Sequence, residues 1–260
     1  MPTGHYDLHT HTTYSDGSEL REMIAAAQQA GLDAIGLSDH CVVWDDPFDR
    51  SDRFDFHRTY EARRSDIEAA RTEFEITVRD GVEMNYDPNY EDAIEAFLES
   101  AEFDYAIGSV HYAGEHYIVR KGFFADADDE RKQEAVDTYI DWQVHLIESE
   151  LFDVIGHLDL CERMPALAGF LSDDHITALI DALTNSSTIP EINGGKVFDD
   201  ANANDPHLLE RFRDAGIRFA LGSDAHRPAE IGERFAYLSD IVAESDLALL
   251  EHQEIAGERE

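Results

Sequence analysis

Basic residues, and lysine above all, are scarce in this sequence. The 260 residues include 57 aspartates and glutamates but only 20 lysines and arginines, so the formal charge is 20 − 57 = −37. Lysine occurs only at Lys121, Lys132 and Lys196. Because a protein that binds long nucleic acid needs clustered positive charge to displace counterions from phosphates, the composition argues against such a partner.

Cysteine and long apolar runs are scarce as well. The two cysteines, Cys41 and Cys161, cannot form a disulfide framework, which favours a reducing compartment. No stretch approaches the roughly 20 apolar residues needed to span a bilayer. The first residues also lack the basic and apolar regions of a secretory signal. We therefore expect a cytoplasmic protein that does not cross a membrane.

Although the sequence is rich in carboxylates, its apolar content is that of a folded protein. Apolar residues make up 43% of the sequence, whereas disordered acidic tails contain few of them. A charge of −37 repels itself at ordinary ionic strength, but concentrated salt screens that repulsion over a few ångströms. The composition is similar to that of cytoplasmic proteins from extreme halophiles. An unusually acidic mesophilic protein is the alternative.

Short apolar runs alternate with longer amphipathic stretches along the chain. The runs predict seven strands, at Tyr6–His9, Asp33–Leu37, Glu75–Val82, Tyr105–Val110, Phe152–Ile155, Ile189–Ile192 and Ile217–Leu221. The amphipathic stretches predict helices at Glu19–Ala30, Phe54–Phe74, Asp92–Ala101, Glu130–Ser149, Ser172–Asn185 and Pro206–Ala215. Such alternation indicates parallel βα units, which either close into a barrel or spread as an open sheet.

No linker or change of composition divides the chain. We therefore predict one α/β domain over residues 1–260, with a core at about 5–250. The acidic tail, at about 251–260, is expected to end a helix.

Metal-binding residue types gather at the C-terminal ends of the predicted strands. Six of the thirteen histidines lie there, at positions 9, 11, 40, 111, 157 and 226, together with carboxylates such as Asp16, Glu83 and Asp224. In His9-x-His11 and in Asp224-x-His226 the two side chains are two residues apart, so on a strand they point to the same side. In a parallel barrel all strand C-termini meet at one mouth, where active sites are built.

Imidazole and carboxylate together are ligands for zinc, manganese and iron. Six histidines with three or more carboxylates exceed the four ligands of one tetrahedral ion, which predicts a multinuclear centre with a bridging carboxylate. Other histidines lack this placement, and we expect His145, His175 and His252 to be solvated or to cap helices. Cys41 and Cys161 each follow a candidate segment, and we expect buried, inert thiols there.

Read in order, the strand-end motifs form a recognisable series. They are His9-Thr-His11 with Asp16-Gly-Ser, Ser-Asp39-His40, Glu83, Ser-Val-His111, Gly-His157-Leu-Asp and Gly-Ser-Asp224-Ala-His226. This series resembles that of the polymerase-and-histidinol-phosphatase (PHP) family, over about residues 5–235. Glu83 followed by Tyr86 and Pro88 is most similar to the histidinol-phosphate phosphatase branch. The resemblance implies the family's distorted, TIM-like (β/α)7 barrel, in agreement with seven predicted strands.

Carried over residue by residue, the resemblance implies a three-metal site. The implied ligands are His9, His11, Glu83 and Asp224 for the first metal, Glu83, His111 and His157 for the second, and Asp16, His40 and His226 for the third. Within this set we predict Asp224 and His226 as the catalytic residues. Two to three divalent ions (Zn, Mn or Fe) would lower the pKa of a bridging water, so that hydroxide is available to attack a phosphate monoester.

Basic residues that could contact a phosphate are few. Arg163 resembles a basic position near the phosphate in histidinol phosphatases, and the further candidates are Arg120, Lys121 and Lys196. Those phosphatases often carry Asn-Thr-Ala-Gly-x-Arg after the sixth strand, whereas this chain has phenylalanine, Phe198, in place of the arginine. Either Lys196 compensates for the missing arginine, or the pocket accepts another monoester.

The sequence therefore predicts a metal-dependent phosphatase of L-histidinol phosphate, acting in histidine synthesis. The alternative is a PHP phosphoesterase that acts on nucleotides, oligonucleotide ends or another small phosphomonoester. An amidohydrolase-type enzyme would usually need a metal-bridging lysine or an equivalent ligand in mid-barrel, where this chain offers Glu83, His111 and His157 instead. A non-catalytic metal-binding protein is expected only if the ligand set is broken, and it is intact.

Overall fold

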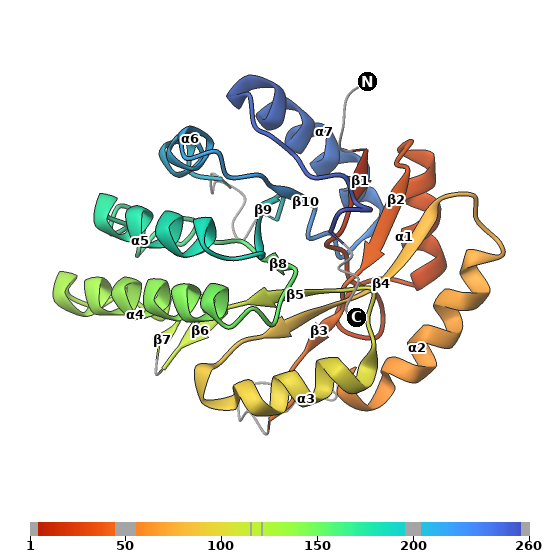
Figure 1. Ribbon diagram of the computed structural model, residues 1–260, viewed down its shortest axis with the longest axis horizontal. Coiled ribbons are helices and arrows are strands. Elements are labelled where there is room, and N and C mark those ends of the chain that lie inside the picture. The colour runs from red at the N-terminus through yellow and green to blue at the C-terminus, as the bar shows by residue number, and fades with distance from the viewer. Residues whose placement is uncertain (1–4, 45–55, 115, 121, 196–203, 256–260) are drawn as a thin grey trace.

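Seven parallel strands follow one another in chain order, with helices around them (Figure 1). The computed structural model describes residues 5–44, 56–114, 116–120, 122–195 and 204–255. The strands are β1 (Tyr6–Asp7), β2 (Ala34–Leu37), β4 (Thr77–Asn85), β5 (Tyr105–Ser109), β8 (Val154–Ile155), β9 (Ile189–Asn193) and β10 (Ala220–Gly222). Each corresponds to a strand predicted from the sequence.

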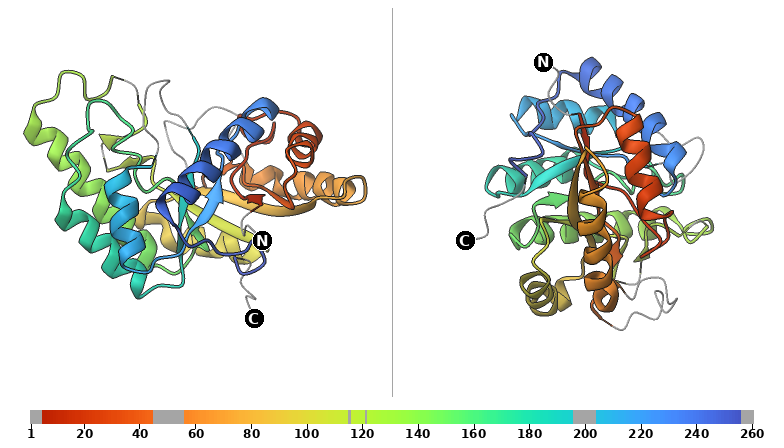
Figure 2. Two further views of the ribbon diagram at one scale, coloured as in Figure 1. Left: turned by 90° about the horizontal axis from the view of Figure 1, so that it is seen from above. Right: turned by 90° about the vertical axis from the view of Figure 1, so that its right-hand side faces the viewer.

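The first and last strands meet and nearly close the sheet on itself. The main-chain N–H of Leu8 donates to the carbonyl of Leu221 at 3.0 Å, and that of Asp224 donates to the carbonyl of His9 at 2.7 Å. The views of Figure 2 show the strands inside and the helices outside. The predicted barrel is thus confirmed, and the open sheet is excluded.

The helices cover the outside of the barrel. They are α1 (Leu20–Gln29), α2 (Phe56–Arg71), α3 (Glu91–Ala101), α4 (Asp129–Glu148), α5 (Asp173–Thr184), α6 (Pro206–Asp214) and α7 (Pro228–Ser245), with a 3-10 turn, η2, at Pro88–Tyr90. The first six lie close to their predicted bounds. In the described part of the chain no helix is long and apolar enough to cross a membrane.

The acidic tail does not end a helix, because residues 246–255 are not helical, so that prediction is wrong. Helix α7 ends at Ser245 because Asp246 takes the left-handed conformation, with φ of 53°. The following residues return to the sheet, where the N–H of Phe219 donates to the carbonyl of Ala248 at 2.9 Å. Burial of Leu250 and Ile255 holds this segment against the barrel.

Two short strand pairs extend the C-terminal mouth. Strand β3 (His40–Cys41), which follows β2, pairs in parallel with β4, and this sets His40 opposite Glu83. Strands β6 (Tyr112–Ala113) and β7 (His116–Tyr117) form a small antiparallel pair after β5. The strand β3 therefore places a candidate ligand beside the one on its neighbour.

The barrel interior is filled by side chains below that mouth. Tyr105 is fully buried and its hydroxyl donates to the carbonyl of Leu8, on the far side of β2 and β4. A Cβ added at Gly36 or Gly81 would lie 2.0 or 2.2 Å from the Tyr105 side chain, so these two glycines make room for it. The packed interior is consistent with a polar site at the C-terminal end of the barrel.

Candidate metal centre

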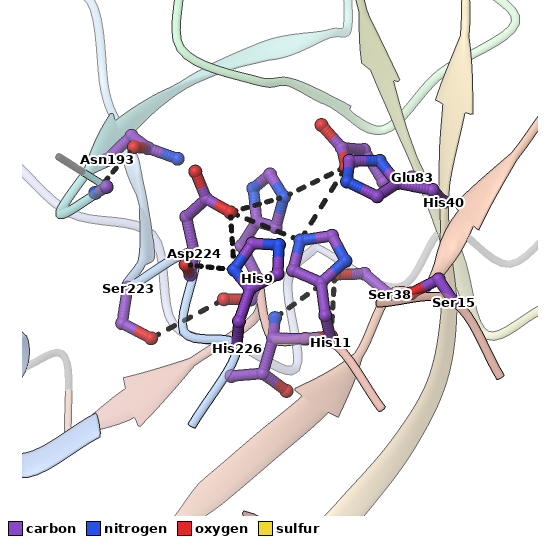
Figure 3. A network of polar contacts seen from close by, with 12 residues as sticks. His9, His11, Ser15, Ser38, His40, Glu83, Asn193, Ser223, Asp224 and His226 are labelled. Carbon is purple, nitrogen blue, oxygen red and sulfur yellow. Dashed lines mark hydrogen bonds and ion pairs between the residues drawn. The ribbon is translucent and has the colours of Figure 1, made fainter. Parts of the chain in front are cut away.

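The nine side chains predicted as metal ligands lie together at the mouth of the barrel. They come from the C-terminal ends of five barrel strands (β1, β4, β5, β8 and β10) and from β3, and are His9, His11, Asp16, His40, Glu83, His111, His157, Asp224 and His226. Figure 3 shows those from the two ends of the chain pointing toward those of β3 and β4. His11 and Asp224, which are 213 residues apart in sequence, are in contact at 3.1 Å.

Glu83 occupies the centre of this cluster. Its Oε1 lies 3.1 Å from Nε2 of His157 and 3.4 Å from Nε2 of His111. Its Oε2 lies 2.5 Å from Nδ1 of His40 and 3.4 Å from Nε2 of His9. A carboxylate with imidazoles facing both of its oxygens has the arrangement of a ligand that bridges two metal ions.

Asp224 and Asp16 line the open side of the cluster. Oδ1 of Asp224 lies 3.1 Å from Nε2 of His11 and 3.8 Å from Nδ1 of His226. Oδ1 of Asp16 lies 3.3 Å from Nε2 of His226 and 3.8 Å from Nε2 of His40. The side chains of Asp16 and His226 are each 30% exposed, whereas those deeper in the barrel are almost fully buried.

Potential ligand atoms fall into three overlapping groups, each within 4.8 Å. The groups are His11, Asp16, His40 and His226; His9, His11 and Glu83; and His40, Glu83 and His111. The first group contains all three residues that the resemblance implies for the third metal. The other two share Glu83, as expected of a bridging residue.

The buried end of the cluster has the features of a cation site. Nε2 of His9 is buried 3.4 Å from Oε2 of Glu83 and has no hydrogen-bond partner among the described residues. Buried polar atoms are costly without partners. A Cβ at Gly195 would lie 2.3 Å from Oδ2 of Asp224, so glycine keeps space open beside that carboxylate. Divalent metal ions fit these residues.

The imidazoles of the cluster stabilise the ionised form of its carboxylates, and one histidine, His11, is held neutral. Burial raises the pKa of Glu83, but the imidazoles of His40 and His9 hold that pKa well below its ordinary value. Burial also raises the pKa of Asp224, which His9 and His11 nevertheless keep well below its usual range. Burial and His40 lower the pKa of His11 to about 4. Ionised carboxylates and a neutral imidazole are the species that coordinate metals.

A second layer of polar residues, which the sequence analysis missed, orients the ligands. Oε1 of Glu191 lies 2.8 Å from Nδ1 of His9, and Oδ1 of Asn85 lies 2.5 Å from Nδ1 of His111. Ligand histidines commonly use their second ring nitrogen in this way. For Glu191 the available signal was a carboxylate inside the apolar run Ile189–Ile192.

The loop after β1 is held by a buried carboxylate, Asp39. Its Oδ1 accepts the N–H of Thr12 at 2.6 Å and the hydroxyl of Ser15 at 2.8 Å. Its Oδ2 accepts a hydrogen bond at 2.7 Å from the Nε–H of Arg63, a residue of α2. Arg63 also forms an ion pair with Asp80. This chain of contacts ties the loop that carries Asp16 to helix α2.

Arg163, predicted to contact the phosphate, is buried and bonded to protein groups. Its Nε lies 2.9 Å from Oδ1 of Asp159, and its Nη1 donates to Oδ1 of Asn193 at 2.7 Å and to the carbonyl of Gly195 at 3.0 Å. The guanidinium therefore holds the glycine segment beside Asp224. A direct contact between Arg163 and substrate stays a prediction.

Of the other predicted basic contacts, the described residues include Arg120 alone. Arg120 is exposed in the segment between β7 and α4. Lys121 and Lys196 lie outside the described residues. Their roles toward substrate stay predictions.

Several residues set aside as structural behave as expected, with one exception. Cys41 and Cys161 are buried free thiols, and burial raises the pKa of both. His175 caps the start of α5. His252 is instead buried outside any helix, with its ring 6.0 Å from that of Tyr6, so the expectation of a solvated or helix-capping residue is wrong there.

Comparison with known proteins gives matches along most of the chain. Residues 7–193 match the PHP domain model. The chain is 34% identical over 246 residues to "Probable histidinol-phosphatase" of Deinococcus radiodurans, covering 90% of this chain and 91% of that protein. It is 27% identical over 240 residues to the histidinol-phosphatase of Lactococcus lactis, covering 85% and 83% of the two chains.

A solved structure shows the same fold. The histidinol phosphate phosphatase of Lactococcus lactis, complexed with zinc, L-histidinol and phosphate, matches with a TM-score of 0.74 and 24% identity, covering 94% of this chain and 95% of that one. That likeness establishes the barrel. The family model and the 34% identical relative establish the kinship: this chain belongs to the PHP domain family.

Proposed function

We propose that this chain is a metal-dependent phosphatase that hydrolyses L-histidinol phosphate to L-histidinol and phosphate. The observation that carries the proposal is the cluster of six histidines and three carboxylates around Glu83 at the barrel mouth. The names of the two relatives, and of the zinc, L-histidinol and phosphate complex, support this choice of substrate. The reaction serves histidine synthesis.

The metal set we propose is two to three divalent ions, Zn, Mn or Fe. The proposed ligands are His9, His11, Glu83 and Asp224 for the first, Glu83, His111 and His157 for the second, and Asp16, His40 and His226 for the third. When bound, the ions supply Lewis-acid charge to phosphate oxygens and lower the pKa of a coordinated water. Their charge also offsets the repulsion between a phosphate and a chain of net charge −37.

The protein's own hydrogen bonds prepare the ligand atoms. Nδ1 of His226 lies 3.0 Å from the carbonyl oxygen of Asp224, which only accepts, so the proton sits on Nδ1 and Nε2 faces Asp16. His9 is arranged in the same manner, with Nδ1 toward Glu191. Asp224 and His226 belong to the partly exposed side of the cluster, where a substrate enters, and we propose them as the catalytic residues.

Substrate preference tests the proposal. The full chain, loaded with metal in concentrated KCl, is assayed with L-histidinol phosphate, nucleoside monophosphates and an aryl phosphate. We expect kcat/KM for L-histidinol phosphate to exceed the others by about 10²-fold or more, since a site built to hydrogen-bond its substrate rejects analogues that lack those groups. Equal values would contradict the substrate, and a preference for nucleotides would favour the alternative phosphoesterase.

We further propose that the chain works in the salt-rich cytoplasm of a halophile. The charge of −37 is the support, because salt screens repulsion among surface carboxylates. The expected result is a melting temperature that rises from low to multimolar KCl, followed by circular dichroism. A parallel series in sucrose controls for solute exclusion. A melting temperature that is independent of KCl would contradict salt adaptation.

A further inference from the structure

Glu191 is a buried carboxylate on β9 that lies outside the predicted ligand set. It is 6% exposed, and its strand runs between β8 and β10. The segments that follow these neighbours carry His157 on one side and Asp224 on the other. Glu191 thus lies directly behind the cluster rather than in it.

One oxygen of Glu191 sets the orientation of His9. Oε1 lies 2.8 Å from Nδ1 of His9, and a carboxylate only accepts, so the hydrogen resides on Nδ1. The other ring nitrogen, Nε2, then presents its lone pair toward Oε2 of Glu83, 3.4 Å away. This is the carboxylate–histidine–metal arrangement that fixes the tautomer of a ligand.

The second oxygen of Glu191 holds the main chain at His157. Oε2 accepts the N–H of His157 at 3.1 Å and an amide N–H of Asn193 at 2.8 Å. His157 has φ of +29°, a conformation that residues other than glycine rarely adopt. Its Nε2 lies 3.1 Å from Glu83, so the bond from Glu191 supports the backbone from which this side chain reaches the centre.

Gly222 leaves the space that Glu191 occupies. A Cβ at this position would lie 1.8 Å from Oε1 of Glu191 and 2.5 Å from Cβ of His9. An alanine there displaces the carboxylate, the histidine or both. Gly222 therefore provides an independent way to disturb the same contact.

We infer that Glu191 is a positioning residue that couples the first and second metal positions by fixing His9 and His157 together. This inference rests on the proposed metal-dependent function. The third position does not depend on Glu191, because Asp16, His40 and His226 come from other segments.

Glu230 offers a matched comparison on the third position. Its Oε2 accepts the N–H of His226 at 2.8 Å and that of Arg227 at 3.0 Å. Glu150, at the opposite end of the barrel, accepts the N–H of Ser187 at 3.2 Å. Glu191, Glu230 and Glu150 are all carboxylates that accept main-chain hydrogen bonds. The same Glu→Gln change can therefore be made beside the first and second metal positions, beside the third, and far from all of them.

The experiment titrates the full-length, metal-free chain and its variants with zinc against a chromophoric chelator. Glu191→Gln is expected to weaken two of the bound equivalents by about 10–100-fold and to leave the remaining one unchanged. Glu230→Gln is expected to weaken one equivalent only, and Glu150→Gln none. Gly222→Ala should reproduce the pattern of Glu191→Gln.

The outcomes separate this inference from the proposed function. Zinc binding by Glu191→Gln that equals that of the unaltered chain, or that is weakened only as in Glu230→Gln, would overturn the role of Glu191. In either case the unaltered chain still binds metal and the phosphatase proposal stands. An unaltered chain that binds no zinc, manganese or iron would overturn both. Unchanged circular dichroism spectra of Glu191→Gln and Gly222→Ala show that folding is not the cause of a loss.

Discussion

Replacing Glu83 by glutamine is expected to lower kcat/KM by about 10³-fold or more, since metal-ion catalysis supplies several kcal/mol and each 1.36 kcal/mol is a factor of ten. Glu83 faces His9 and His40 through one oxygen and His111 and His157 through the other. The amide of glutamine puts a donating nitrogen in place of one oxygen and leaves the other oxygen uncharged, so one bridged position loses its ligand and the other keeps only a weaker one.

The loss in Glu83→Gln should be visible in metal content as well as in rate. We expect about one equivalent to remain, on Asp16, His40 and His226, because these residues form a group without Glu83. Metal analysis after desalting, with Glu150→Gln as the matched variant, measures the difference. A Glu83→Gln chain that keeps all its metal and its rate would contradict a bridging role.

Replacing Arg63 by methionine is expected to lower the free energy of unfolding by about 3–5 kcal/mol. Removing one partner of a buried ion pair leaves the other partner as an uncompensated buried charge. Arg63 is fully buried; its Nε donates to Asp39 at 2.7 Å, and a terminal nitrogen donates to the carbonyl of Gly81 at 2.7 Å. Its loss leaves Asp39 without a buried cation, and Asp80 keeps only the partly exposed Arg64. Denaturant unfolding at constant high salt measures the change.

A surface arginine supplies the control for Arg63→Met. Arg21 pairs with Glu73, and both side chains are nearly half exposed. Such pairs contribute little, so Arg21→Met should leave the unfolding midpoint within experimental error. Equal midpoints for Arg63→Met and the unaltered chain would show that the buried network does not stabilise the fold.

The strand ends are the part of the molecule that sequence predicts best. The spacing of His9 and His11 predicts two side chains on one side of an extended segment, and barrel closure brings them to Asp224, which itself takes a left-handed conformation with φ of 54°. All seven predicted strands occur in order. The choice between a barrel and an open sheet needed the contact between the first and last strands, which local periodicity does not encode.

The polar residues that orient the ligand histidines could not be predicted from the spacing of residues in the sequence. Glu191 and Asn85 are polar residues of strands β9 and β4, and only the three-dimensional packing shows which histidine each one faces. Arg163 was predicted from a family resemblance as a phosphate contact, yet the structure surrounds it with Asp159 and Asn193. Tertiary hydrogen bonds of this kind leave no periodic pattern in the sequence.

Stepwise metal loading tests the proposed metal-dependent phosphatase most directly. The metal-free full chain receives zinc or manganese in fractions of an equivalent, and release of phosphate from L-histidinol phosphate is measured at each step in high salt. We predict no turnover without metal and a rise to a plateau at about two to three equivalents per chain. A metal-free chain that releases phosphate as fast as the loaded one, or a loaded chain that releases none, would contradict it.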